Sequence, residues 1–334
     1  MKVSDFDFSL PQHLVAERPL QKRDRSRLLV LHRDGTIEHK RFTDLPSYLE
    51  AGDMLLLNNT KVFPARLKGV KENGDPMEIL LIEKIGDAWE ILSKGKYTGI
   101  LKFSEDIEAE IYHGRRARFG ASRNVMEIAG RLGTMPLPPY IKRQPDELDR
   151  ETYQAVFASR EGSIAAPTAS LHFTEDLLDK IRRKGVIVRE LTLHIGIGTF
   201  KPVRAENVED HVMDSEYFEL DKEIVNEVGA VKARGRRIFA VGTTTTRAIE
   251  GFVSGNCRAT STNGRLRGTT DLFIYPGYSF KAIDCLLTNF HLPRSTPLML
   301  ATALCSRENI QRAYKEAKEK QYRFLSYGDA MLIL

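Results

Sequence analysis

The sequence predicts an α/β main domain built from both ends of the chain, with a small antiparallel β-barrel or sandwich inserted between them. Three observations support this prediction. Residues 150–334 alternate helix-like and strand-like segments, which is typical of a largely parallel sheet. Residues 61–149 contain short strand-like segments separated by turns. Residues 1–60 contain strand-like segments that would pack with the C-terminal part of the chain.

The N-terminal part is predicted to supply two strands and one helix. The apolar segments LLVLHR (28–33) and DMLLLN (53–58) are predicted as the strands. Between them, TDLPSYLEAG predicts a short helix that begins at Thr43 and ends before Gly52.

The central part of the sequence consists of short strand-like segments. The segments EILLIE, WEILSK, IEAEIYH and RRARFG are short and rich in β-branched or aromatic residues. Turn signals, among them Asn73-Gly74 and His113-Gly114, separate them. The prolines of MPLPPY (135–140) then favour an extended connector. Short strands at this spacing predict a small antiparallel barrel or sandwich.

The C-terminal part begins with a clear helix at 174–184, with Thr174 as the N-cap and Gly185 beyond its end. Four further elements are predicted after it, in this order: the strand VIVRELTLHI, the helix DKEIVNEVGAVKARG, the strand RIFAVG and the helix TTTRAIEGFV. The polar segment 254–268 is expected to be a mobile loop, and 307–321 a helix with one solvated face.

Composition excludes several classes of protein. Hydrophobic residues make up 42% and charged residues 28% of the 334 residues, which rules out wholesale disorder and a fibrous repeat. No stretch reaches the ~20 apolar residues of a membrane helix. Only three cysteines occur, none in a C-x-x-C pair, so a disulfide framework and a zinc motif are not expected. A cytoplasmic location is predicted, and the net charge of +5 weakly favours a polyanionic partner.

Polar segments that interrupt the periodic pattern are the candidate sites. In 161–174, Thr168 and Ser170 precede His172 and a helix start, where backbone N–H groups could hold an anion. A plain loop with a local histidine hydrogen bond is the alternative. In 191–203, the glycines of Gly196-x-Gly198-Thr199 could let a ligand approach the backbone. His194, taken alone, is more often a core histidine.

Two further segments could supply a base and an anion cradle. Alternation over 211–220 places Asp214 and Glu216 on the face of Phe218, where an apolar setting would raise a carboxyl pKa and favour a base. Spacing alone favours a surface strand with solvated acids. In 240–250, a strand, a glycine, Thr243 and Thr244 precede a helix, which suits either an anion or ribose cradle or a simple N-cap.

Residues 270–300 place Tyr275 beside Pro276-Gly277, where aromatic rings either pack together or stack a purine. Asn289 and His291 follow a strand, where ligands of α/β sheets usually lie. A dense basic run, 18–27, lies in irregular chain and is predicted to contact phosphate.

Taken together, these motifs resemble one family. The chain resembles the S-adenosylmethionine:tRNA ribosyltransferase-isomerases of queuosine biosynthesis. The segments that carry this resemblance are NNTKVFPARL, AAPTASLHFT, LTLHIGIGTFKPV, HVMDSEYF, VGTTTTR, TDLFIYPGYSFKAID and TNFHLPRST. FDFSLPQHLVAERPLQKRDRSRLLVL resembles the family's N-terminal segment, and the resemblance runs from about residue 5 to the C-terminus in motif order.

The resemblance implies a fold, a reaction and its substrates. The fold is a discontinuous α/β main domain, 1–60 and 150–334, with an inserted antiparallel β-barrel, 61–149. The ribosyl group of S-adenosylmethionine, the co-substrate, is transferred to 7-aminomethyl-7-deazaguanine at the tRNA wobble position and isomerised to epoxyqueuosine, and adenine and methionine leave. No prosthetic group, metal or membrane is implied, and a monomer is expected.

Site residues follow from the resemblance and from residue chemistry. His172 is the predicted base, with His194 or Glu216 as its partner. Binding of S-adenosylmethionine is assigned to Thr168, Ser170, Gly196, Gly198, Thr199, Thr243, Thr244, Tyr275, Asn289 and His291. Binding of tRNA phosphates is assigned to Arg23, Arg25, Arg27, Lys61, Arg66, Lys142 and Arg143. The alternatives are an S-adenosylmethionine-dependent tRNA methyltransferase and a non-catalytic RNA-binding protein.

Overall fold

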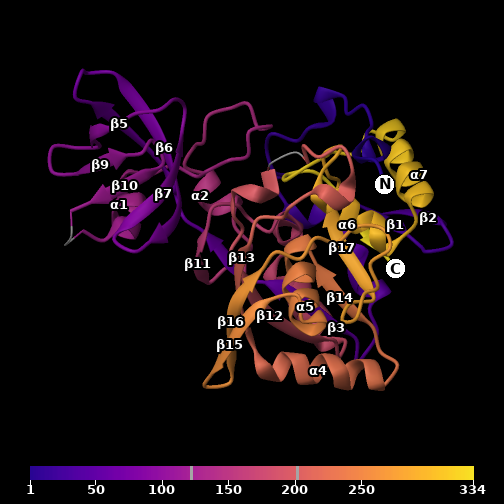
Figure 1. The fold of residues 1–334 in the computed structure, drawn as a ribbon. Helices are drawn as coiled ribbons and strands as arrows, with labels where there is room; N and C mark the ends of the chain where they lie inside the picture. The colour runs from indigo at the N-terminus through magenta and orange to yellow at the C-terminus, as the bar shows by residue number, and fades with distance from the viewer. Residues whose placement is uncertain (121–122, 201–202) are drawn as a thin grey trace.

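A ten-stranded mixed sheet forms the main domain of the computed structural model, which describes residues 1–120, 123–200 and 203–334 (Figure 1). Its strands, in spatial order, are β15 (Arg258–Thr262), β16 (Arg265–Thr270), β13 (Glu216–Asp221), β12 (Ile187–Leu193), β3 (Met54–Asn58), β14 (Ile238–Val241), β17 (Cys285–Asn289), β18 (Ala330–Ile333), β1 (Arg27–Leu31) and β2 (Ile37–Arg41).

The centre of this sheet is parallel and combines both ends of the chain. Leu55 of β3 pairs with Val188 of β12 on one side and with Phe239 of β14 on the other, both in parallel. β14 is parallel to β17, and β1 is parallel to β18. The antiparallel pairs are β12–β13, β13–β16 and β15–β16 at one edge, β1–β2 at the other edge, and β17–β18 between them. The predicted α/β class is therefore confirmed, in a sheet that is mixed.

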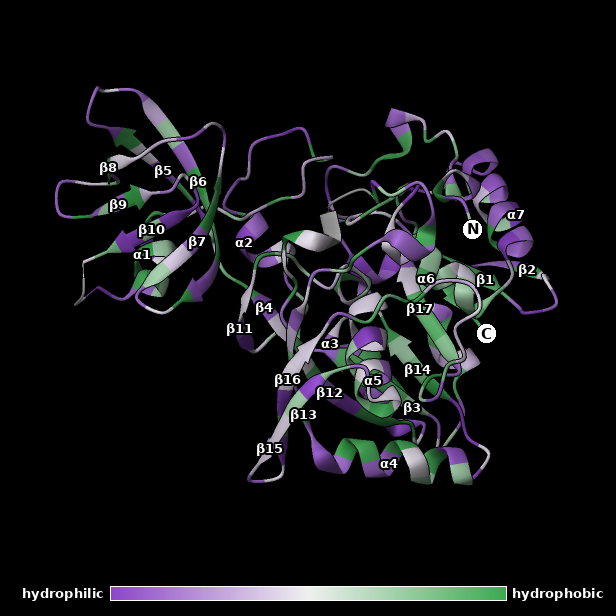
Figure 2. Ribbon diagram, in the orientation of Figure 1, coloured by the Kyte–Doolittle hydropathy of each residue, from purple (hydrophilic) through white to green (hydrophobic). Residues whose placement is uncertain are grey.

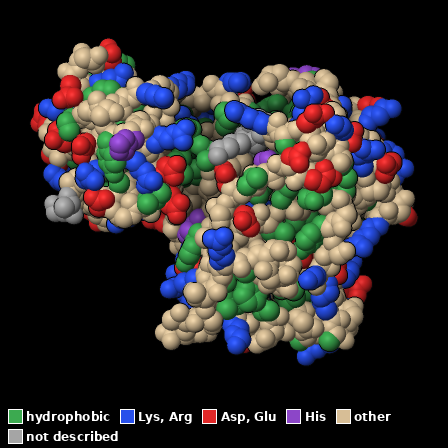
Figure 3. Space-filling view, viewed as in Figure 1, with side chains coloured by type: hydrophobic (Ala, Val, Ile, Leu, Met, Phe, Trp, Pro, Cys, Tyr) green, Lys and Arg blue, Asp and Glu red, His purple; other side chains and the backbone are tan. Residues whose placement is uncertain are grey.

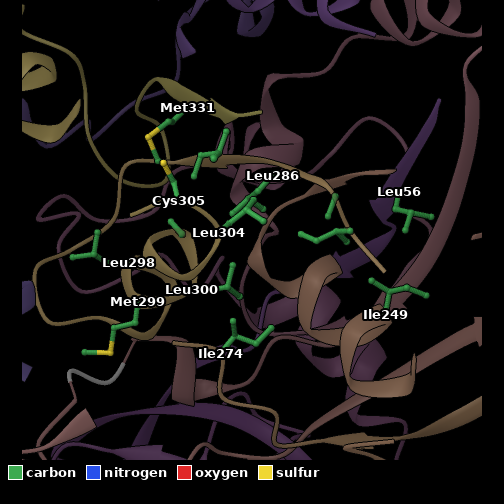
Figure 4. Packing of buried hydrophobic residues seen from close by; sticks show 14 of the residues in the cluster. Leu56, Ile249, Ile274, Leu286, Leu298, Met299, Leu300, Leu304, Cys305 and Met331 are labelled. Atoms are coloured by element: carbon green, nitrogen blue, oxygen red, sulfur yellow. The ribbon is translucent and has the colours of Figure 1, made fainter. Parts of the chain in front are cut away.

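Helices cover the sheet on both faces because its central strands are apolar throughout. Successive side chains of a strand point to opposite faces of the sheet. Leu56 of β3 and Leu286 of β17 therefore lie in one core cluster with Ile249 of α5 (Thr243–Ser254), as Figure 4 shows. Their neighbours Leu55 and Leu287 enter a second cluster on the opposite face. The helices are α3 (Glu175–Arg183), α4 (Lys222–Ala233), α6 (Thr296–Leu304) and α7 (Arg307–Glu319), and α7 is largely hydrophilic whereas β14 is hydrophobic (Figure 2).

The inserted unit is a closed antiparallel barrel. Its strands close in the order β10 (Arg116–Phe119), β7 (Ala88–Ser93), β6 (Pro76–Ile85), β5 (Arg66–Lys71), β8 (Gly99–Lys102) and β9 (Glu108–Tyr112), and β9 pairs back with β10. A separate core that includes Trp89 and Ile111 fills it, and α1 (Val125–Leu132) packs against it. Of the two predicted alternatives, barrel and sandwich, the inserted unit is therefore the barrel.

A second, two-stranded sheet lies where the chain passes between barrel and main domain. β4 (Thr60–Val62) pairs in parallel with β11 (Arg160–Ser163), and the short helix α2 (Asp149–Thr152) precedes β11. The chain that leads into the barrel is thereby joined to the chain that leaves it.

Three local predictions are wrong. Residues 254–268 are not a loop, because most of them form the hairpin β15–β16, whose turn residues Asn263 and Gly264 have φ of 49° and 75°. Residues 211–215 are not strand, and β13 begins at Glu216. The helix expected from Thr43 is the 3-10 helix η4 (Phe42–Tyr48), which contains Pro46.

Candidate active site

A cavity opens at the carboxyl ends of β14 and β17, where α/β sheets usually bind ligands. It encloses ≈ 690 Å³ of space, part of it open to solvent. Three of the polar segments meet there: the 3-10 helix η5 (Thr168–His172) with the residues before it, the start of α5, and the chain after β17.

Gly242 makes the turn from β14 into α5 with φ of 87°, a conformation that favours glycine. A Cβ at this position would lie 3.9 Å from the Cβ of Ala169, so the start of α5 and η5 lie side by side at the cavity. Neither α5 nor α6 has a side-chain N-cap hydrogen bond. Thr243 and Thr244 of α5, and Ser295 and Pro297 around the start of α6, line the cavity.

Half of the residues assigned to S-adenosylmethionine line this cavity: Thr168, Thr243, Thr244, Asn289 and His291. Thr168 donates from Oγ1 to Oδ1 of Asn289 at 3.1 Å, and Thr244 Oγ1 accepts from Asn58 Nδ2 at 3.2 Å. His291 Nε2 lies 2.7 Å from Thr288 Oγ1, and burial lowers its pKa to about 3. Neighbouring polar groups therefore fix the side chains of four of these residues, Thr168, Thr244, Asn289 and His291.

His172 lies behind the cavity wall and reaches the cavity through Asn289. The ring is 4% exposed and stacks on Phe42 with ring centroids 4.9 Å apart. Nδ1 is 2.8 Å from Ser26 Oγ, and Nε2 is 3.2 Å from Asn289 Nδ2. Burial, together with the charges of Arg323 and Arg23, lowers the pKa of His172 to about 3. The ring is therefore neutral at physiological pH.

His194 lies beside the two-stranded sheet that leads to the barrel. Its Nδ1 is 2.8 Å from Thr60 Oγ1, and its ring stacks on Tyr217 at 5.7 Å. A Cβ on Gly162 would come within 2.8 Å of Nε2, so this glycine of β11 lets the ring lie close to the backbone. Burial lowers its pKa, and the nearby Glu219 partly opposes that effect.

Glu216 is buried, as alternation from the start of β13 predicts, and it is ion-paired. Its side chain is 3% exposed and contacts the guanidinium of Arg247 on α5. Its Oε1 accepts from the backbone N–H of Gly196 at 3.0 Å. The expectation of solvated acids, favoured by spacing alone, is wrong for this residue. Arg247 also lines a smaller cavity of ≈ 310 Å³, which shares Thr243 and Thr244 with the larger one.

Four of the remaining assigned residues that the structure describes, Ser170, Gly196, Gly198 and Tyr275, do not line the larger cavity. A Cβ at Gly198 would lie 2.6 Å from Asp214 Oδ2, so this glycine permits a close approach. Ser170 is fully buried, and its Oγ has no hydrogen-bond partner within the described part of the chain. Tyr275 packs against Phe273 at 5.1 Å. Thr199 belongs to the 3-10 helix η6 (Ile197–Phe200), and its side chain is outside the described residues.

Most of the cations assigned to tRNA have partners within the protein. Arg27 contacts Asp329 at 3.2 Å, and Arg143 binds Asp149 with two contacts of 2.6 Å. Lys61 pairs with Glu161 at 2.8 Å, Arg66 pairs with Glu78 at 2.6 Å, and Arg23 donates to the carbonyl of Gln154 at 2.9 Å.

Arg25 and Lys142 are exposed instead, and neither forms an ion pair with a described residue. Figure 3 shows Lys and Arg side chains on the barrel and on the facing edge of the main domain, around the hollow between them.

Sequence reasoning missed Ser26, Tyr140, Ser295 and Ser326. Ser26 binds His172, and the other three line the cavity. Tyr140 ends the proline-rich connector and donates or accepts at Ser326 Oγ over 2.7 Å, a contact between residues 186 positions apart. No local pattern marks such residues, because only the folded chain brings them to the cavity.

The described residues contain no group of three or more His, Cys, Asp or Glu side chains that could hold a metal ion. None of the helices in the described ranges is long and apolar enough to cross a membrane.

Comparisons with known proteins agree on one family. The model of the family described as "Queuosine biosynthesis protein" matches residues 3–333. Proteins named S-adenosylmethionine:tRNA ribosyltransferase-isomerase are 50% identical in Thermodesulfovibrio yellowstonii and 49% identical in Staphylococcus haemolyticus, each over 100% of both chains. A crystal structure of S-adenosylmethionine tRNA ribosyltransferase from Thermotoga maritima covers 99% of this chain and 100% of its own, at 37% identity and a TM-score of 0.58. The chain therefore belongs to the queuosine biosynthesis protein family.

Proposed function

We propose that this chain transfers the ribosyl group of S-adenosylmethionine to 7-aminomethyl-7-deazaguanine at the tRNA wobble position and isomerises it, giving epoxyqueuosine and releasing adenine and methionine. Full-length relatives named S-adenosylmethionine:tRNA ribosyltransferase-isomerase support this activity. The observation that carries it is the cavity at the ends of β14 and β17, because motifs far apart in the sequence converge there.

The proposed reaction needs acid and base groups. The sulfonium of S-adenosylmethionine acidifies the adjoining ribose carbon, so a positioned base can remove a proton from it. Departure of adenine requires a proton donor at the ring nitrogen, and the attacking amine must be neutral. Because these steps are proton transfers, we expect turnover to persist after dialysis against a chelator. Loss of turnover that added metal restores would contradict this.

The cavity is the proposed site of S-adenosylmethionine. Thr168, Asn289 and His291 form one side of it, and the start of α5 with Thr243 and Thr244 forms another. The smaller adjoining cavity shares Thr243 and Thr244 with the larger one and is also lined by Arg247 and by residues 272–274. Gly196 is proposed to act through its backbone, because its N–H holds Glu216 in place.

The hydrogen-bonding state of Nε2 favours His194 among the three candidate bases; His194 itself lines neither cavity, and its neighbour Ile195 lines the larger one. His172 has hydrogen bonds at both ring nitrogens, and Glu216 contacts a guanidinium. Within the described part of the chain, Nε2 of His194 has no hydrogen-bond partner, while Thr60 holds Nδ1. We therefore propose that His194 accepts the proton and that Glu216 with Arg247 shapes the adjoining wall.

Paired substitutions test this assignment. His194→Ala should lower kcat by about 100-fold or more, the usual contribution of a general base, without loss of tRNA binding. His172→Ala should leave kcat at saturating S-adenosylmethionine within about fivefold. If instead His194→Ala turns over within a few-fold of the parent and His172→Ala does not, His172 is the base.

Labelled co-substrate distinguishes transfer of the ribosyl group from transfer of a methyl group. With S-adenosylmethionine labelled in the ribose, label should enter the tRNA, and with methyl-labelled co-substrate it should leave as methionine. Methyl label in the tRNA would establish a methyltransferase instead. Salt-dependent tRNA binding without transfer of either label would leave a non-catalytic RNA-binding protein.

We also propose that the enzyme acts in the cytoplasm as a monomer, without a prosthetic group. Light scattering of the purified protein should give the mass of one 37.9 kDa chain. Twice that mass would contradict the monomer.

A further inference from the structure

We infer that His172 is a positioning residue, which together with the Leu325 carbonyl makes the Thr168–Asn289 edge of the cavity a hydrogen-bond acceptor for a donor group of S-adenosylmethionine. The inference rests on the proposed function, because it names how one edge of that site recognises its co-substrate. It follows from the direction of four hydrogen bonds, three of them buried and one part-buried.

The amide of Asn289 can adopt only one orientation. Its Nδ2 lies 3.2 Å from the carbonyl oxygen of Leu325 and 3.2 Å from Nε2 of His172. A rotated amide would place Oδ1 against the Leu325 carbonyl, so that two acceptors would meet in a buried space. Asn289 is 2% exposed, and water does not compensate such a contact. Asn289 therefore donates one amide hydrogen to the Leu325 carbonyl and the other to Nε2 of His172.

This orientation fixes the proton on His172. Because Asn289 donates to Nε2, Nε2 must be an acceptor, and the single ring proton must lie on Nδ1. From Nδ1 it is donated to Ser26 Oγ at 2.8 Å. A second proton on the ring would point at an N–H of Asn289, while Arg23 and Arg323 already place positive charge nearby. Phe42 holds the ring plane by stacking.

The fixed orientation of the Asn289 amide also sets the direction of its hydrogen bond with Thr168 at the cavity wall. Thr168 donates its only hydroxyl proton to Oδ1 of Asn289 at 3.1 Å, so its Oγ1 offers lone pairs alone. Both residues line the cavity, and together they form an edge that accepts and does not donate. Such an edge suits a donor. S-adenosylmethionine offers the adenine amino group, the methionine ammonium and the ribose hydroxyls, whereas its carboxylate would be repelled.

Nuclear magnetic resonance of the ring nitrogens tests the first step in the unmodified protein. His172 should be the neutral Nδ1–H tautomer and should stay so from pH 8 to pH 5. In Asn289→Asp, a carboxylate replaces the donor, so His172 should gain a proton and titrate at higher pH than in the parent. An Nε2–H tautomer, or ordinary titration of His172 in the parent protein, would overturn the inference.

Calorimetry of S-adenosylmethionine binding tests the second step. Thr168→Val keeps the shape and removes the acceptor, so Kd should rise about tenfold, the value of one good hydrogen bond. Thr168→Ser should stay within about threefold of the parent. His172→Ala should raise the Kd or KM about tenfold with kcat little changed, and His172→Gln, which supplies an acceptor, should recover most of the loss. Equal losses in Thr168→Ser and Thr168→Val would contradict the acceptor role.

Two controls separate the possible failures. Adenosine and methionine, tested as competitors against Thr168→Val and the parent, identify which part of the co-substrate carries the donor, because only that fragment should lose affinity. The melting temperature and tRNA affinity of each variant report whether it folds. If the parent itself does not bind S-adenosylmethionine, the proposed function fails. If the parent binds and Thr168→Val binds equally well, only this inference fails.

Discussion

At the scale of single residues, the site depends on polar groups buried with partners. Glu216 of β13 and Arg247 of α5 form a buried ion pair, although they are 31 positions apart in sequence. Alternation predicts that Glu216 shares a face with Phe218, and the structure agrees. The partner could not be predicted, because it depends on how α5 packs against the sheet.

Removing one member of this pair should be costly. Arg247→Gln should lower the free energy of unfolding by about 3 kcal/mol, because it removes one charged member of a buried ion pair. Arg267→Gln is the matched control, since Arg267 is 50% exposed and lies 3.3 Å from Glu219. Its effect should stay below about 1 kcal/mol. Equal effects in urea unfolding would show that burial of the first pair does not matter.

Buried neutral histidines should make stability depend on pH. The folded pKa of His172 and of His291 is about 3, below the value of about 6.5 expected in the unfolded chain. Their contribution is therefore complete above pH 6.5 and is lost as the pH falls from 6.5 toward 3. Between pH 7.5 and 5.5 each should lower the free energy of unfolding by about 1.4 kcal/mol. His172→Gln should remove one such contribution, and an unchanged slope would contradict the assignment.

At the scale of elements, the sequence predicts regular helices and apolar strands well and irregular pieces poorly. β3, α3 and α5 lie where periodicity and capping residues place them. The β15–β16 hairpin escapes the apolar pattern because both strands are mostly polar and β15 is exposed throughout, although Asn263-Gly264 is a strong hairpin signal. Pro46 turned an expected helix into a 3-10 helix, because proline cannot donate within an α-helix.

Two glycines near the end of the inserted barrel should respond in opposite directions to the same substitution. A Cβ at Gly133 would lie 1.9 Å from the carbonyl oxygen of Pro64, so Gly133→Ala should destabilise the barrel. Gly130 lies within α1 with no atom near a Cβ, so Gly130→Ala should stabilise it by about 0.5–1 kcal/mol. Hydrogen exchange of the barrel strands measures both. Destabilisation by Gly130→Ala would contradict this packing.

At the scale of the whole molecule, the inserted domain is predicted by a change in the sequence pattern. Short strand-like segments in 61–149 give way to alternating helix-like and strand-like segments after residue 150. The β1 and β3 strands join a sheet with strands from residues 187–333 because apolar strands need partners on both sides. The cavity could be predicted only in part. The motifs around Thr168, Thr243 and Asn289 are visible in sequence, but Ser26 and Tyr140 are brought in by folding alone. We propose 1–60 with 150–334, and 61–149, as the domains.

Binding of tRNA should depend on the exposed cations near the N-terminal basic run. Arg25→Glu should weaken tRNA binding and reduce the slope of log affinity against log salt by about one, because one phosphate contact is lost. Arg234→Glu is the control, since Arg234 is also exposed but follows α4, at the end of the main domain away from the barrel (Figure 1). An unchanged slope for Arg25→Glu would remove that residue from the interface.

The most direct test of the proposed activity uses an anticodon stem-loop that carries 7-aminomethyl-7-deazaguanine, mixed with the protein and S-adenosylmethionine. The adenine released and the mass of the nucleoside product are measured together. We predict one adenine per modified nucleoside and a mass increase equal to the epoxycyclopentanediol group. A methyl-sized increase with S-adenosylhomocysteine, or RNA binding without any product, would contradict the proposed reaction.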